Sequence, residues 1–136
     1  MSTAVVVGGS SGLGRVVAER LARHGDEVVI TSRTKAKADE VAAEIGHGAR
    51  GLAVDLADPK SIAAALESVD TVDHLVITAI EQGINSLKAF DADHAVKAIT
   101  IKLVGYTEVV RVLRPRFTPT AFWVRNGATG EASGLG

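Results

Sequence analysis

The sequence predicts an α/β domain built on a doubly wound open sheet of five parallel strands in the order 3-2-1-4-5. Short runs rich in β-branched residues alternate with longer, alanine-rich helical patterns along the 136-residue chain. Crossovers of this length connect parallel strands, and they do so with right-handed connections. The chain is 46% hydrophobic but only 4% aromatic, which is typical of a sheet buried between helices.

The first half of the chain predicts two strand–helix units. Residues 3–7 form a continuous apolar run that ends in glycine, and they predict a buried strand. Residues 13–24 carry apolar side chains at helical spacing, and Gly25 ends this helix. The EVVIT run at 27–31 predicts the second strand, and 35–45 is an amphipathic helix of alternating charge.

The middle of the chain predicts the third and fourth strands. Residues 50–54 predict a strand that ends before an aspartate. Asp58 is a good N-cap and Pro59 suits the first helical position, so a helix is expected to begin there and run to about residue 68. The VDHLVIT run at 72–78 predicts the fourth strand.

The last part of the chain predicts one long helix and a final strand. Residues 91–113 place apolar side chains on one face of a helix, and Pro115 ends it. Residues 120–124 are the candidate fifth strand. We therefore expect one domain over residues 1–124 and a glycine-rich, disordered tail over residues 125–136, where hydrophobic periodicity is lost.

Composition argues against several classes of partner. Fifteen basic and sixteen acidic residues are scattered along the chain, which gives no sign of a nucleic-acid-binding surface. The absence of cysteine excludes disulfides and thiolate sites, and the four histidines lack the spacing of a metal site. No apolar stretch approaches the ~20 residues that span a bilayer, and the N-terminus lacks the basic region of a signal peptide. We expect a cytoplasmic protein without a nucleic-acid, membrane or metal partner.

The glycine-rich segment GGSSGLG, residues 8–14, lies between the first strand and the first helix. There Gly8 allows a sharp turn, Gly12 lets the backbone approach a pyrophosphate, and Gly14 lets helix and strand pack closely. The helix N-terminus offers unpaired N–H groups to a phosphate, and the hydroxyls of Ser10 and Ser11 lie beside them. The segment predicts nucleotide binding in a Rossmann-type sheet, and its placement argues against the alternative of a plain glycine-rich turn.

The spacing Gly8-x-x-x-Gly12-x-Gly14 resembles the signature of the short-chain dehydrogenase/reductase family, although Val7 stands where that family usually has threonine. The resemblance covers about residues 3–116 and implies a nicotinamide dinucleotide cofactor. It implies that Asp55-Leu56, after the third strand, contacts the adenine, and that Thr78-Ala79 contacts a ribose. In the long helix, Lys102-Leu-Val-Gly105 matches the family's Asn-x-x-Gly pattern.

The end of the second strand bears on which cofactor is preferred. A carboxylate there binds the 2′-hydroxyl of NAD and repels the 2′-phosphate of NADP, but this chain has Arg33 instead. Arg33 can pair bidentately with a phosphate, and Arg15 lies near the same edge, unless both are solvated surface arginines. NADP is therefore favoured over NAD. The expected cofactor-binding residues are Gly8, Ser10, Ser11, Gly12, Leu13, Gly14, Arg33, Asp55, Leu56, Thr78 and Ala79.

The catalytic residues of the family are not recognisable in this chain. They are a Tyr-x-x-x-Lys pair and an upstream serine, whereas the single tyrosine here, Tyr106, lies in the long helix with Val110 four positions on. The family's Asn-Asn-Ala-Gly turn is replaced by residues 77–80, ITAI, and its helix asparagine by Lys102, which is either a proton donor or a surface lysine. We therefore name no catalytic residue and expect no hydride transfer by this chain itself.

Several hypotheses follow from these residues. The first is a truncated, frame-shifted or shortened short-chain dehydrogenase/reductase that prefers NADP, whose parent activity is hydride transfer between nicotinamide and a carbonyl or alcohol carbon. The alternatives are a non-catalytic NADP(H)-sensing module and a non-functional fragment. A flavodoxin-like receiver would explain neither the glycine spacing nor Asp55-Leu56. Because the family pairs through its long helices, a homo-oligomer through residues 91–113 is also expected.

Overall fold

The chain is described from a computed structural model over residues 2–79, 87–125 and 128–131, with side chains up to residue 125. Its sheet runs in the order β3-β2-β1-β4-β5-β6. The first five strands are parallel, so the predicted order 3-2-1-4-5 is confirmed, and β6 pairs antiparallel with β5. The strands are β1 (Thr3–Val7), β2 (Glu27–Ser32), β3 (Arg50–Ala53), β4 (Val72–Ile77), β5 (Phe117–Arg125) and β6 (Ala128–Glu131).

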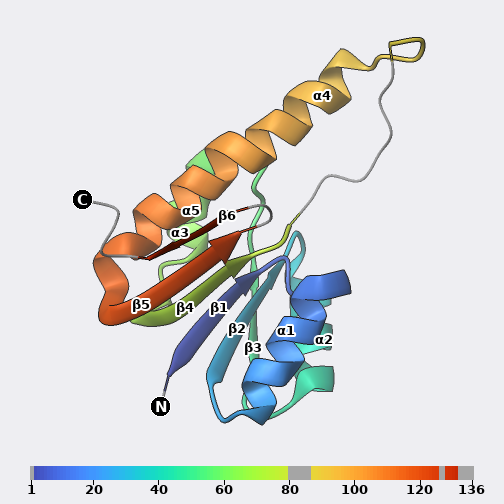
Figure 1. Cartoon of the computed structure of the whole chain (residues 1–136). Helices are drawn as coiled ribbons and strands as arrows, with labels where there is room; N and C mark the ends of the chain where they lie inside the picture. The colour runs from blue at the N-terminus through green and yellow to red at the C-terminus, as the bar shows by residue number, and fades with distance from the viewer. Residues whose placement is uncertain (1, 80–86, 126–127, 132–136) are drawn as a thin grey trace.

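Helices cover both faces of the sheet and make a three-layer fold (Figure 1). Alternate residues of β1 point to opposite faces, so Val5 and Val7 join the core under α3 and α5, and Ala4 and Val6 join the core under α1 and α2. No described helix is long and apolar enough to cross a membrane, and a cytoplasmic location stays a prediction. The helices are α1 (Gly12–Arg23), α2 (Lys35–Ile45), α3 (Ile62–Ala65), α4 (Ala92–Ile99) and α5 (Tyr106–Leu113).

The helix expected from residue 58 to about residue 68 is broken and shorter. A 3-10 turn, η1 (Pro59–Ser61), leads into α3, and the Asp58 side chain makes no capping bond. After α3 the backbone tightens into hydrogen bonds of the 3-10 type, one of them from the N–H of Val69 to the carbonyl of Leu66 at 3.1 Å. Leu66 and Val69, three residues apart, are both buried in this stretch, so its apolar side chains still face the core.

The long helix after β4 is continuous but not uniform. Its N-terminus is capped by Asp91, whose carboxylate accepts the N–H groups of Asp93 and His94 at 3.0 and 3.2 Å. Between α4 and α5 the segment η2 (Thr100–Gly105) is a π-helix. Figure 1 shows α4 projecting beyond the carboxyl ends of the strands, and α4 contains no buried residue, whereas α5 is packed on the sheet.

The strand β5 begins at Phe117, before the expected start at residue 120, and contains Pro119. Proline cannot donate to a strand ladder, so it is tolerated only at an edge or a bulge. Here the pairing with β4 shifts register between Val72 and His74, and Pro119 lies opposite that irregularity. The strand β6 lies in the stretch expected to be a tail, and a domain boundary at residue 124 stays a prediction.

A carboxylate joins three strands at the amino end of the sheet. Asp73 on β4 accepts the backbone N–H of Thr3 on β1 at 2.8 Å and the hydroxyl of Thr118 on β5 at 2.8 Å. These two hydrogen bonds, the first above all, favour the charged form and lower the pKa of Asp73 below its ordinary value, against a smaller opposing effect of burial.

This lowered pKa predicts an acid-dependent stability. A carboxylate whose pKa is lower in the folded than in the unfolded state contributes stability above about pH 4, and that contribution is lost as the pH falls through the folded pKa. We expect Asp73→Asn to be less stable than the wild type at neutral pH, with the difference shrinking towards about pH 2. Urea unfolding across this range measures it, with Asp70→Asn, a change at an exposed aspartate, as the control. A difference between Asp73→Asn and wild type that does not vary with pH would contradict this role.

Candidate functional site

A cleft of about 780 Å³ opens at the carboxyl ends of β1 to β4. The expected cofactor-binding residues, taken together, all line it, so the structure brings them to one place. Their roles in cofactor binding stay predictions. The other lining residues are Val7, Thr31, Ser32, Lys37, Val54, Ala57, Lys97 and Ile101.

The turn formed by residues 8–14, called the phosphate turn below, is tightly packed on its inner side. Gly8 has φ +88°, and a Cβ there would lie 2.6 Å from the backbone N of Ala79. Its own N–H donates to the hydroxyl of the buried Thr31 at 3.2 Å. A Cβ on Gly14 would meet the carbonyl oxygen of Gly8 at 2.5 Å. Glycine is therefore required at positions 8 and 14 by close packing.

The outer side of the phosphate turn is open. Gly12 has φ +56°, and a Cβ there would have nothing within 4 Å. Ser11, the N-cap of α1, has an extended backbone and its side chain makes no capping hydrogen bond, while the first turn of α1 contains no acidic residue. The first N–H groups of a helix have no partner within the helix, and they carry its positive dipole end. This arrangement can accept a phosphate from the open side of the turn.

The cations near β2 have different surroundings. Arg33 is exposed, follows β2 and lines the cleft, and Lys37 lines it from the first turn of α2. Lys35 is bound elsewhere, because its Nζ lies 2.7 Å from both Asp39 Oδ1 and the carbonyl oxygen of Gly51. The structure thus brings two of these three cations to the cleft.

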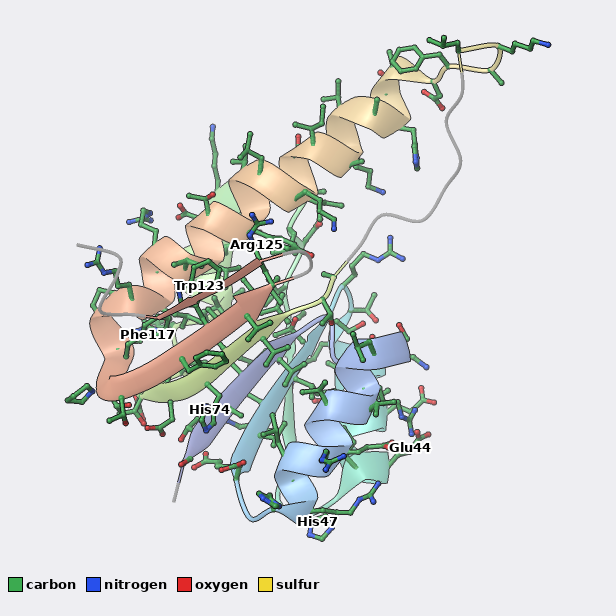
Figure 2. The ribbon with its side chains drawn as sticks, viewed as in Figure 1. Glu44, His47, His74, Phe117, Trp123 and Arg125 are labelled. Carbon is green, nitrogen blue, oxygen red and sulfur yellow. The ribbon has the colours of Figure 1, made fainter. Side chains whose placement is uncertain are left out.

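Arg15 does not line the cleft. Its Nε donates to Glu19 at 3.0 Å and its Nη2 donates to Glu44 of α2 at 2.7 Å, so the side chain connects α1 to α2. Glu44 is labelled on α2 in Figure 2. Both hydrogen bonds raise the pKa of Arg15. The expectation that Arg15 shares the phosphate edge with Arg33 is therefore not met by this placement.

The residues after β3 form another wall of the cleft. Asp55 is exposed, and its Oδ1 accepts the N–H of Ala57 at 2.9 Å, which fixes the turn after the strand. Leu56 is buried beneath the long helix, where a Cβ on Gly105 would lie 2.5 Å from the carbonyl oxygen of Leu56. Gly105, noted above in the pattern Lys102-Leu-Val-Gly105, thus lets the helix approach this wall closely.

Tyr106 lies behind the cleft rather than in it. Its side chain is 2% exposed, and its hydroxyl donates to the carbonyl oxygen of Ala79 at the end of the β4 wall. Burial raises the pKa of Tyr106, while the charge of Arg125, labelled near the end of β5 in Figure 2, acts in the opposite direction. Lys102 Nζ lies 5.8 Å from the centre of the Tyr106 ring. This tyrosine is a buried hydrogen-bond donor.

Sequence reasoning missed three cleft side chains of note, Lys37, Lys97 and Ile101. A signal existed for Lys37, because side chains in the first turn of a helix lean towards its N-terminus, which here follows Arg33. No local pattern shows that Lys97 and Ile101 of the long helix approach the cleft. Among the described residues, His, Asp and Glu form no group placed to hold a metal ion.

Known proteins resemble this chain in sequence and fold. The model of the family described as short chain dehydrogenase matches residues 2–122. Over 121 residues the chain is 33% identical to 3-hydroxyacyl-CoA dehydrogenase type-2 of Drosophila melanogaster, covering 82% of this chain and 48% of that protein. Over 113 residues it is 34% identical to 3-oxoacyl-(acyl-carrier-protein) reductase FabG of Aquifex aeolicus, covering 79% and 42% respectively.

A solved structure of a short chain dehydrogenase/reductase family protein also matches, with a TM-score of 0.73 and 33% identity over 84% of this chain and 48% of the other. The chain thus spans about half the length, or somewhat less, of each relative named.

Proposed function

This chain belongs to the short-chain dehydrogenase family, and from that premise we propose that it is the cofactor-binding part of an oxidoreductase that prefers NADP. The parent reaction is hydride transfer between a nicotinamide cofactor and a carbonyl or alcohol carbon. The nicotinamide ring supplies or accepts the hydride, and the residues described here bind and orient the dinucleotide.

The observation that carries this proposal is the phosphate turn, which is tightly packed on its inner side and open on its outer side. The space beside Gly12 suits a pyrophosphate, which would be bound by the free N–H groups at the start of α1 and by the hydroxyls of Ser10 and Ser11. Asp55 and Leu56 would hold the adenine, and the segment at Thr78 and Ala79 a ribose. All these groups line one continuous cleft.

The preference for NADP is supported by charge at the end of β2. Ser32 and Arg33 stand where a carboxylate would select NAD, and Arg33 makes no hydrogen bond or ion pair with any described residue. Its guanidinium is therefore available to a 2′-phosphate, which it can bind bidentately. No hydrogen bond or ion pair with a described residue would be lost when it does so.

The environment of Tyr106 supports a chain that binds the cofactor without reducing a carbonyl. Its hydroxyl is buried and donates to Ala79, so it is not presented to a substrate. The same observation favours the alternative function, a non-catalytic module that senses NADP(H). Carbonyl reduction by the purified chain, abolished by Gly12→Asp, would contradict both.

The proposal is tested by titrating the purified chain with NADPH and separately with NADH, following nicotinamide fluorescence and thermal unfolding. We expect a cooperative transition that both dinucleotides raise, NADPH more than NADH at equal concentration, because a ligand stabilises the state it binds. A cooperative transition that neither dinucleotide shifts would contradict the proposed binding. Absence of a cooperative transition would favour the hypothesis of a non-functional fragment.

We further propose that the protein self-associates through its long helix. Val96, Ile99 and Leu103 are 63%, 60% and 65% exposed and recur at helical spacing, which makes an apolar stripe along α4 and η2. A stripe of this kind is expected to be covered by a second copy.

Ile99→Glu places a charge within this stripe and is expected to convert an associated protein into a monomer in sedimentation velocity, because burying an unpaired carboxylate is costly. Arg20→Gln is a suitable control, since it changes the net charge by the same amount at an exposed position of α1, on the other face of the sheet. A wild-type protein that is monomeric at all concentrations would contradict the association.

A further inference from the structure

Tyr106 connects the long helix to the end of β4. It is the first residue of α5, immediately after the π-helix, and its ring is buried in the core that contains β4 and α5. From there its hydroxyl donates a hydrogen bond to the carbonyl oxygen of Ala79. Ala79 follows the last residues of β4 and lines the cleft, so the bond fixes backbone that faces the ligand space.

Ala79 in turn lies directly against the phosphate turn. A Cβ on Gly8 would come within 2.6 Å of the Ala79 N and 2.8 Å of its Cα, so the two backbones are in contact. The neighbouring N–H of Thr78 donates to the carbonyl oxygen of Val7 at 2.9 Å, which continues the pairing of β4 with β1. On its other side Gly8 is confined by Gly14, so a displacement of Ala79 away from Gly8 gives Gly8 space to move.

The preceding residue supports a different wall of the same cleft. Gly105 packs on the backbone of Leu56, with room for no side chain between them. Two consecutive residues of one helix therefore contact the wall after β3 and the wall after β4. A displacement of this one helical turn would therefore affect both walls.

We infer that Tyr106 is a positioning residue for dinucleotide binding: it holds Ala79, and through Ala79 it holds the phosphate turn at Gly8. The inference rests on the proposed function, because it assigns Tyr106 a part in the affinity for the cofactor. Tyr106 acts on the pyrophosphate end of the site through backbone contacts, so it affects NADPH and NADH alike. It differs in this from Arg33, which discriminates between them.

The test is Tyr106→Phe, which keeps the buried ring and removes only the hydroxyl. We expect binding of NADPH and of NADH to weaken by the same factor, about five- to tenfold, the effect of one lost hydrogen bond. In the ligand-free protein we expect faster amide hydrogen exchange in residues 7–14. Both measurements are made well below the thermal transition, where the variant is fully folded.

Thr118→Val is the matched control, because it removes one hydroxyl hydrogen bond, to Asp73, at the opposite end of the sheet. It is expected to lower thermal stability without changing affinity or exchange in residues 7–14. Equal effects of both variants on residues 7–14 would overturn the inference, and so would unchanged exchange there in Tyr106→Phe. If the wild-type protein binds neither dinucleotide, the proposed function is contradicted instead. The exchange measurement separates the two cases, because it is made without ligand and reports on residues 7–14 directly.

Discussion

Gly14→Ala is expected to destabilise the protein by about 2 kcal/mol and to abolish dinucleotide binding at temperatures where it unfolds. Position 14 lies inside α1, where alanine is favoured over glycine by about 1 kcal/mol. The added methyl group, however, would lie 2.5 Å from the carbonyl oxygen of Gly8 and against the hydroxyl of Thr78. Overpacking against backbone costs about 3 kcal/mol at the upper end of its usual range, so the clash outweighs the helix preference.

Three glycine variants distinguish the packing role of a glycine from its role in ligand binding. Their stabilities are measured by denaturant unfolding and their affinities by titration with NADPH. Gly12→Ala has open space and pays only the cost of a left-handed backbone, about 1 kcal/mol, but its methyl group enters the proposed pyrophosphate site. It should fold and lose NADPH binding. Gly25→Ala has the same open space and a positive φ away from the cleft, so it should lose stability without losing binding. A Gly14→Ala protein as stable as the wild type would show that α1 can move away from β1 at little cost.

Arg33→Glu is expected to reverse the cofactor preference. Loss of charge-assisted hydrogen bonds to the 2′-phosphate, together with repulsion by the new carboxylate, should weaken NADPH binding about a hundredfold. A carboxylate at this place can accept a hydrogen bond from the 2′-hydroxyl of NADH, so binding of NADH should be unchanged or tighter. The ratio of the two dissociation constants, from nicotinamide fluorescence titrations, is the quantity to compare.

The control for this variant is Arg23→Glu, which makes the same change of charge at an exposed residue of α1 outside the cleft. It should leave the ratio of dissociation constants as in the wild type. Because exposed charges more than about 10 Å apart are screened at 0.1 M salt, the general change in field should be small. An unchanged ratio in Arg33→Glu would mean that Arg33 does not contact the 2′-phosphate.

The fold was predictable from the sequence wherever a local pattern determined the structure. The helix over residues 35–45 has the expected bounds because Thr34 caps it and a glycine ends it. The start of β5 could not be predicted, because Pro119 opposes strand formation locally and is accommodated only by a bulge against β4. The strand β6 exists through pairing with β5, and its own sequence carries no periodic signal.

The residues of the candidate site that directly follow a strand could be predicted from the sequence. The carboxyl ends of parallel strands meet at one edge, which brought residues after β1, β2, β3 and β4 into the same cleft. Side chains that reach the cleft from other elements depend on tertiary packing. Arg15 was expected near the phosphate site but does not line the cleft. It bonds instead to Glu44, 29 residues away in the sequence, and no local pattern predicts that contact.

The π-helix of residues 100–105 divides the long helix into two halves that do not share one angular register. A π segment adds roughly one residue to a turn, equivalent to about 100° of rotation about the axis. Val96 and Ile99, before this segment, are exposed, while Val109 and Leu113, after it, are buried in the core. A change of length in this segment would therefore rotate Val96 and Ile99 about the helix axis relative to α5, which is packed on the sheet. The proposed association would then change in geometry without a change in any side chain of the stripe.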